Sequence, residues 1–222
     1  MYKGFAFVCE ARKEWVIALL LMTFICNEGY SQHKGYRPIG DLATFKKQFA
    51  TESSKVSSIE SSFTQEKVLT ALTEKITSTG KFWFKRSNKV RIEYIKPYTY
   101  TMIINGDKML FRDDQKENTV NVRSHKLFQQ INQIMIDCVQ GTVLDSKDFK
   151  VSVFEDEKIY LLEMVPTSRS LREFFSTIVL KVDKKDFTAN SIEMNEKAGD
   201  STNILFKDKK LNTQFSDAVF AF

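Results

Sequence analysis

From residue 59 onward, the chain consists largely of short segments in which apolar and polar residues alternate, joined by very short links. Side chains of a strand point alternately to the two faces of a sheet, so the alternation predicts half-buried β-strands. Parallel neighbours need a crossover of a dozen or more residues, and nearly every link is shorter, which predicts an up-and-down antiparallel sheet of about eleven strands. The predicted strands are Ile59–Leu69, Lys75–Arg86, Val90–Ile95, Tyr98–Ile104, Lys108–Arg112, Thr119–Val122, Phe149–Phe154, Ile159–Val165, Thr177–Val182, Ser191–Asn195, Thr202–Leu211 and Ala218–Phe222.

Two segments depart from the strand pattern and predict helices that cover the sheet. Asp41 can cap a helix that runs to about Ser54. Between Ser124 and Gln140, apolar residues recur at helical spacing, and Gly141 can end that helix. The apolar arc of this second helix is wide for a lone surface helix, so we expect it to pack against the sheet.

The N-terminal segment has the composition of a secretory signal. Basic residues precede an apolar run, Trp15–Cys26, and the small residues Gly29 and Ser31 follow it. A run of about 12 residues is shorter than the ~20 that a membrane-spanning helix needs. We therefore expect a cleaved signal peptide over residues 1–31 and a single domain over residues 32–222. An uncleaved membrane anchor is the alternative.

Cys138 is the only cysteine outside the predicted signal peptide, so we expect no intrachain disulfide. A bacterial lipoprotein carries its acylated cysteine after a small residue. The bulky residues Phe24 and Ile25 precede Cys26, which argues against an acylated anchor there. We expect Cys138 to be a buried structural residue, because His125 would lie about 20 Å away along a continuous helix, too far for proton transfer.

Charge and motifs argue against several function classes. The net charge is +5, with basic and acidic residues interspersed, so the sequence has no basic stripe for nucleic acid. It contains no cluster of metal ligands, no glycine-rich phosphate loop and no nucleophile elbow. We therefore expect a protein that is not an enzyme and that uses no metal or cofactor.

The most unusual predicted strand ends in Arg86. Its Phe82 and Phe84 share a face with Arg86, while Trp83 lies between two lysines on the other face, which we expect to be exposed to solvent. An unpaired charge in a core is costly, so the pattern predicts the wall of an apolar cavity with a polar latch at its rim. As a latch, the guanidinium would donate to backbone carbonyls of a covering helix. A rim arginine paired with a carboxylate is the alternative.

In their order and spacing, these features resemble the LolA family of periplasmic lipoprotein carriers. A leading helix is followed by Ser62–Gln65, then by the strand that ends in Phe82–Arg86, and then by a break at Pro97. Asn105–Phe111, with its predicted tight turn, and a mid-chain amphipathic helix complete the order. The resemblance covers about residues 41–222.

The resemblance implies an incomplete antiparallel β-barrel that is covered by a few α-helices and encloses a hydrophobic cavity. It implies a soluble carrier in the periplasm that binds the acyl anchors of lipoproteins, with an inner-membrane exporter and an outer-membrane acceptor as partners. Arg86 occupies the position of a family arginine that contacts the helical lid, and Ser87 follows where the family usually has a proline. We expect a monomer. A carrier of another amphiphile, such as a glycolipid or an acylated pigment, and a periplasmic lipid-sensing module are the alternatives.

A carrier of acyl chains needs a concave apolar surface and no catalytic group. The residues that we expect to line this surface come from the aromatic strand, the two strands after it and the mid-chain helix. They are Phe82, Phe84, Tyr94, Met102, Ile104, Leu127, Ile131 and Ile134. For each of them, an ordinary dry core is the alternative, because most apolar periodicity belongs to cores.

Overall fold

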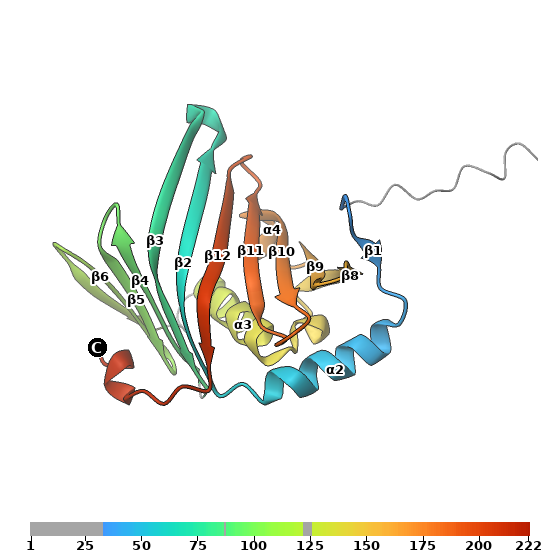
Figure 1. The fold of residues 1–222 in the computed structure, drawn as a ribbon. Coiled ribbons are helices and arrows are strands. Elements are labelled where there is room, and N and C mark those ends of the chain that lie inside the picture. The colour runs from blue at the N-terminus through green and yellow to red at the C-terminus, as the bar shows by residue number, and fades with distance from the viewer. Residues whose placement is uncertain (1–32, 87, 122–125) are drawn as a thin grey trace, which may run out of the picture. The chain divides into compact units, whose positions relative to one another are not determined.

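An antiparallel sheet dominates the structure, and helices lie against it (Figure 1). The structure, a computed structural model, describes residues 33–86, 88–121 and 126–222, without the side chains of residues 126–128, 131 and 132. The predicted signal peptide, residues 1–31, lies outside the described residues. Every strand belongs to one compact unit, Tyr36–Phe222.

Twelve strands are present among the described residues, in two meanders that are joined where β12 pairs with β2. β1 and β7 are the two edges, so the sheet is not closed into a barrel. The prediction of a mainly antiparallel, incompletely closed sheet is therefore confirmed. In sheet order, the strands are β1 (Arg37–Pro38), β8 (Phe149–Glu155), β9 (Ile159–Pro166), β10 (Phe175–Asp183), β11 (Ala189–Glu196), β12 (Ser201–Leu211), β2 (Ser58–Leu69), β3 (Glu74–Lys85), β4 (Lys89–Lys96), β5 (Tyr100–Asn105), β6 (Lys108–Asp113) and β7 (Glu117–Asn121).

The alternation of apolar residues places most of these strands correctly, because most of them have one face on the core. Only β1 lies outside the predicted strands; it is a two-residue strand in which Arg37 pairs with Glu155 of β8. Two residues are too few to show alternation. The predicted tight turn is present between β5 and β6, where Asn105 and Lys108 face each other across Gly106 and Asp107.

The prediction of a last strand over Ala218–Phe222 is wrong. The chain forms a short 3₁₀ helix there, η4 (Asp217–Phe220), which begins after Ser216. Its apolar residues are satisfied by packing rather than by strand pairing, because Phe220 is buried against Ile103 and Leu110.

The sequence pattern predicts that the face of β3 that carries Trp83 is exposed to solvent. For Trp83 this prediction is wrong. Trp83 is partly buried beside η4, and the guanidinium of Arg91 lies 5.7 Å from the centre of its ring. Lys85 and Lys89 both bind Asp217 of η4, at 2.6 and 2.7 Å. The C-terminal segment thus covers the sheet face opposite to the one that Phe82 lines.

Two longer helices lie over the other face. The first, α2 (Leu42–Ser54), starts at Asp41, whose carboxylate accepts a 2.9 Å hydrogen bond from the backbone N–H of Thr44. The second, α3 (Lys126–Gln140), ends at Gly141, which has a φ of +72°. A Cβ at Gly141 would lie 2.7 Å from the carbonyl oxygen of Phe49, so the glycine also lets the end of α3 approach α2. The shorter helices are η1 (Thr70–Leu72), η3 (Val143–Asp145) and α4 (Arg169–Arg172).

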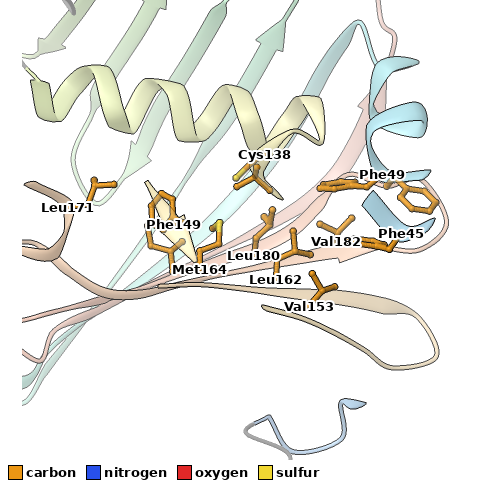
Figure 2. Close-up of a cluster of buried hydrophobic side chains, with 13 residues drawn as sticks. Phe45, Phe49, Cys138, Phe149, Val153, Leu162, Met164, Leu171, Leu180 and Val182 are labelled. Carbon is orange, nitrogen blue, oxygen red and sulfur yellow. The ribbon is translucent and has the colours of Figure 1, made fainter. Parts of the chain in front are cut away.

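The largest buried cluster joins both helices to strands β8–β10 (Figure 2). Phe45 and Phe49 of α2 stack with ring centres 5.5 Å apart, and Cys138 of α3 faces the same strands. The buried members of this cluster are Phe45, Phe49, Cys138, Val143, Phe149, Val153, Leu162, Met164, Leu171, Ile178, Leu180, Val182 and Phe187.

Candidate binding cavity

An apolar cavity of about 300 Å³ lies between the sheet and α3. Its walls come from strands β2–β5 and β9–β12, which belong to both meanders, and from one face of α3. The lining residues are Ile59, Ser61, Phe63, Gln65, Phe82, Ile92, Tyr94, Met102, Ile134, Met135, Cys138, Val139, Met164, Phe175, Ile178, Thr188, Ala189, Ile192, Met194, Ile204, Phe206 and Lys209.

Four of the residues expected from the sequence lie in this lining. They are Phe82 on β3, Tyr94 on β4, Met102 on β5 and Ile134 on α3. The ring centres of Phe82 and Phe206 lie 5.4 Å apart. This contact links the meander of β2–β7 to that of β8–β12 in the cavity wall.

Two expected lining residues, Phe84 and Ile104, lie elsewhere and are only 1% and 0% exposed. They point to the same face of the sheet as Phe82, but they lie further along their strands. There, they share a buried cluster with Val56, which follows α2, and Val139 of α3 packs against this cluster. Both belong to a dry cluster, which was the alternative for every one of these residues.

The side chains of Leu127 and Ile131 lie outside the described residues, although the backbone of α3 is described at both positions. His125 lies outside the described residues as well.

Strands β9–β12 supply a part of the lining that was not predicted from the sequence. Ile192 and Met194 alternate on β11, and Ile204 and Phe206 alternate on β12, so the same pattern could have identified them. What the pattern does not contain is the pairing of β12 with β2, which brings these side chains opposite Phe82.

A glycine shapes one wall of the cavity. A Cβ at Gly80 of β3 would lie 2.2 Å from the carbonyl oxygen of Glu93 and 2.5 Å from the ring of Phe63. Because glycine has no Cβ, the ring of Phe63 can lie close to Gly80. There it meets Tyr94 edge to face, with ring centres 5.1 Å apart.

Tyr94 also brings one polar pair into the wall. Its hydroxyl donates a 2.8 Å hydrogen bond to Oε1 of Gln65. Burial, followed by the neighbouring Tyr100, raises the pKa of Tyr94 to about 12. The phenol therefore stays neutral and adds no charge to an apolar cavity.

Cys138 is buried, as the sequence analysis predicts, and its side chain reaches the cavity. Burial, with a smaller contribution from Asp137, raises the pKa of the Cys138 thiol to about 12. A thiol of this kind is protonated near neutral pH and is a poor nucleophile. Within the described residues, no group of three or more histidine, cysteine or acidic side chains is placed to hold a metal ion.

Arg86 lies at the end of β3 and connects the sheet to the end of α2. Its Nε donates to the carbonyl oxygen of Val56 at 2.6 Å, and its Nη2 donates to that of Ser53 at 2.7 Å. Ser53 is in the last turn of α2, where a cation also interacts favourably with the helix dipole. Both partners are main-chain carbonyls, which favours the latch over the alternative of a carboxylate pair.

An apolar cavity between a sheet and its covering helices is the architecture of a ligand-binding protein. More particularly, the chain belongs to the LolA family, because the family model "Outer membrane lipoprotein carrier protein LolA" matches residues 54–222. An outer-membrane lipoprotein carrier protein from Methylococcus capsulatus is 22% identical over 205 residues, which cover 92% of this chain and 91% of that relative.

Solved structures are also similar. A LolA superfamily protein from Nitrosomonas europaea is 12% identical, with a TM-score of 0.44 over 80% of this chain and 97% of that one. The MucA/MucB complex of Pseudomonas aeruginosa contains a chain that is 11% identical, with a TM-score of 0.48 over 81% of this chain and 60% of that one. In the part of the chain that the structure describes, no helix has both the length and the apolar character needed to cross a membrane.

Proposed function

We propose that this protein is a soluble periplasmic carrier that binds the acyl anchors of lipoproteins in its cavity and transfers them from the inner to the outer membrane. One observation carries the proposal: a chain of the LolA family holds an apolar cavity between its sheet and α3. The signal peptide over residues 1–31 would deliver the chain to the periplasm. An inner-membrane exporter would load the carrier, and an outer-membrane acceptor would unload it.

The energetics of lipid transfer explain why such a cavity is needed. Burial contributes about 0.8 kcal/mol per CH₂, so a single long acyl chain resists transfer into water by on the order of 10 kcal/mol. A carrier lowers this cost by offering apolar walls, and it needs no reacting group. The neutral Tyr94 and the protonated Cys138 suit a site that binds without chemistry.

The size of the cavity indicates that loading requires movement. At about 300 Å³, the cavity lies at the lower end of the range for ligand pockets. An anchor with several acyl chains needs more room, which α2 and α3 could supply by moving away from the sheet. In this mechanism, the hydrogen bonds from Arg86 to Ser53 and Val56 hold α2 in the closed state and break on opening.

A release assay tests the proposal. Spheroplasts that synthesise a labelled lipoprotein would be incubated with the purified protein, and the lipoprotein in the supernatant would be measured. We expect release by this protein and none by serum albumin, which binds fatty acids but is not a lipoprotein carrier. Mass spectrometry of lipids that co-purify from the periplasm would complement the assay. A glycolipid or pigment as the bound species, with no lipoprotein released, would support the other amphiphile carriers instead.

A further inference from the structure

The cavity has one polar corner, and a β-bulge creates it. β12 pairs regularly with β2 as far as Lys207 opposite Ser62, and the pairing resumes with Lys210 opposite Glu60. Two residues of β12, Asp208 and Lys209, therefore stand opposite the single residue Ser61. Asp208 has a φ of +53°, in the left-handed region. Such a bulge re-aims the side chains that follow it.

The bulge decides which side chain enters the cavity. Ile204 and Phe206 line it, so simple alternation would direct Asp208 inward and Lys209 to solvent. In the structure the reverse holds: Lys209 lines the cavity, and Asp208 is exposed and accepts a 2.8 Å hydrogen bond from the hydroxyl of Ser62. An irregularity of the backbone thus places a cation in a wall that is otherwise almost entirely apolar.

The Lys209 ammonium retains capacity to donate. Its side chain is only 15% exposed, and its Nζ donates to the hydroxyl of Thr188 at 2.7 Å. Nζ also forms an ion pair with the carboxylate of Asp186, at 3.3 Å from Oδ2, and donates a 3.4 Å hydrogen bond to its Oδ1. An ammonium has three N–H groups, so the contacts with Thr188 and Asp186 leave one of them for a ligand.

Ser61 is the second polar group at this corner. The residue is 3% exposed and lines the cavity, and its Oγ has no hydrogen-bond partner among the described residues. A buried hydroxyl without a partner is destabilising, so its presence in a native fold calls for an explanation. Ser61 stands directly opposite the bulge that carries Lys209.

We propose that Ser61 and Lys209 form a subsite for an acyl carbonyl oxygen of the cargo, with the hydrocarbon chain lying along the apolar walls. Both groups can donate a hydrogen bond, and an ester carbonyl, an amide carbonyl and a carboxylate all accept. The subsite fixes the direction in which a chain enters the cavity. This inference rests on the proposed function, because it takes an acylated cargo as given.

Matched lipids test the subsite. Monopalmitoylglycerol and 1-O-hexadecylglycerol carry the same head group, but only the first has a carbonyl, and palmitate presents the carboxylate. Their Kd values for the purified protein would be measured by displacement of a fluorescent apolar probe. We expect the wild-type protein to bind the ester about tenfold more tightly than the ether, as one or two hydrogen bonds predict.

Substitutions test whether Ser61 and Lys209 cause the preference for the ester over the ether. Ser61→Ala and Lys209→Met should each remove most of the preference for the ester and leave ether binding unchanged. Lys210→Met, on the exposed side of the same strand, should change nothing. The melting temperature of Ser61→Ala should stay the same or rise, because the variant removes an unpaired buried hydroxyl, and this separates the subsite from a folding defect.

The outcomes separate the subsite from the carrier function. Equal binding of ester, ether and palmitate by the wild-type protein, or equal weakening of all three lipids in the variants, overturns the subsite and leaves the carrier proposal standing. Failure to bind any of the lipids overturns both. If the variants lose only the preference for palmitate over the ether, the result supports a subsite that binds a carboxylate. If they also lose the preference for the ester over the ether, it supports a subsite for the carbonyl that ester and palmitate share.

Discussion

The helix-covered face of the sheet contains a filled region and a hollow one. Over β8–β10, Phe45 and Phe49 of α2 enter the space between helix and sheet, and Phe45 meets Tyr160 with ring centres 4.5 Å apart. Where β2–β5 meet β11 and β12, the rings of Phe63, Phe82 and Phe206 belong to the wall, and a cavity remains in front of them.

The sheet alone does not decide where the cavity lies. Both regions present alternating apolar side chains, and both are buried beneath helices. What differs is what the helices contribute: α2 adds two large rings to the filled region, whereas α3 alone faces the cavity, with Ile134, Met135, Cys138 and Val139. We infer that the side chains of the helices determine which part of the sheet can accept a ligand.

The largest expected effect comes from emptying the filled region. Phe49 is fully buried, so Phe49→Ala should lower the free energy of unfolding by about 3–5 kcal/mol. Phe82→Ala removes a ring that already borders empty space, and its cost should be about 1–2 kcal/mol. Urea denaturation measures both, with the half-exposed Phe174→Ala as a control that should change stability by less than about 0.5 kcal/mol. Equal costs for Phe49 and Phe82 would show that the hollow region is packed as tightly as the filled one.

A second effect concerns the connection between α2 and the sheet. Arg86→Leu removes two hydrogen bonds from a charged donor, which should cost about 2 kcal/mol and should alter the exchange of cargo. Transfer of a fluorescent acyl probe to acceptor vesicles, followed over time, measures that exchange. Arg91→Leu is a matched control, because Arg91 also binds a main-chain carbonyl, that of Val219, but on the opposite face of the sheet. If the transfer kinetics of Arg86→Leu equal those of the wild-type protein, Arg86 does not act as a latch.

The sequence predicts the sheet well and the cavity only in part, for a physical reason. Alternation reports which face of a strand is apolar, and that was enough to place eleven strands and the face that carries Phe82. It does not report whether a helix fills the space in front of that face, so Phe84 and Ile104 could not be told from true lining residues. The bulge at Asp208 was equally hidden, because it depends on pairing with Ser61 across more than half of the chain.

Filling the cavity should convert the hollow region into a second filled one. Ala189 of β11 lines the cavity, so Ala189→Ile would occupy part of the empty space. We expect the free energy of unfolding to rise by about 0.5–1 kcal/mol, as for other cavity-filling changes, and acyl binding to weaken. Ala189→Ser, which adds almost no volume, is the control. Lipid binding that survives in Ala189→Ile, measured by probe displacement, would place the ligand elsewhere.

The smallest expected effect lies on the opposite face of the sheet and leaves both regions intact. Hydrogen bonds from Lys85 and then Lys89 lower the pKa of Asp217 to about 2. Because the pKa is depressed in the folded state, Asp217 stabilises the docked C-terminal segment above about pH 4, and this contribution is lost as the pH falls through about 2. Asp217→Asn should therefore weaken the docking of η4 near neutral pH, and the docking of this variant should depend much less on pH between about 4 and 2.

Trp83 reports on that docking, because it packs beside η4. Its fluorescence, followed from pH 5 to about pH 2, should change in the wild-type protein and stay nearly constant in Asp217→Asn. Glu173→Gln, which removes an exposed carboxylate from another part of the surface, should behave like the wild type. Acyl binding should be the same in all three proteins, because the segment covers the face that carries no cavity. A loss of acyl binding in Asp217→Asn would mean that the two faces of the sheet are coupled, and that the helices alone do not determine where the ligand binds.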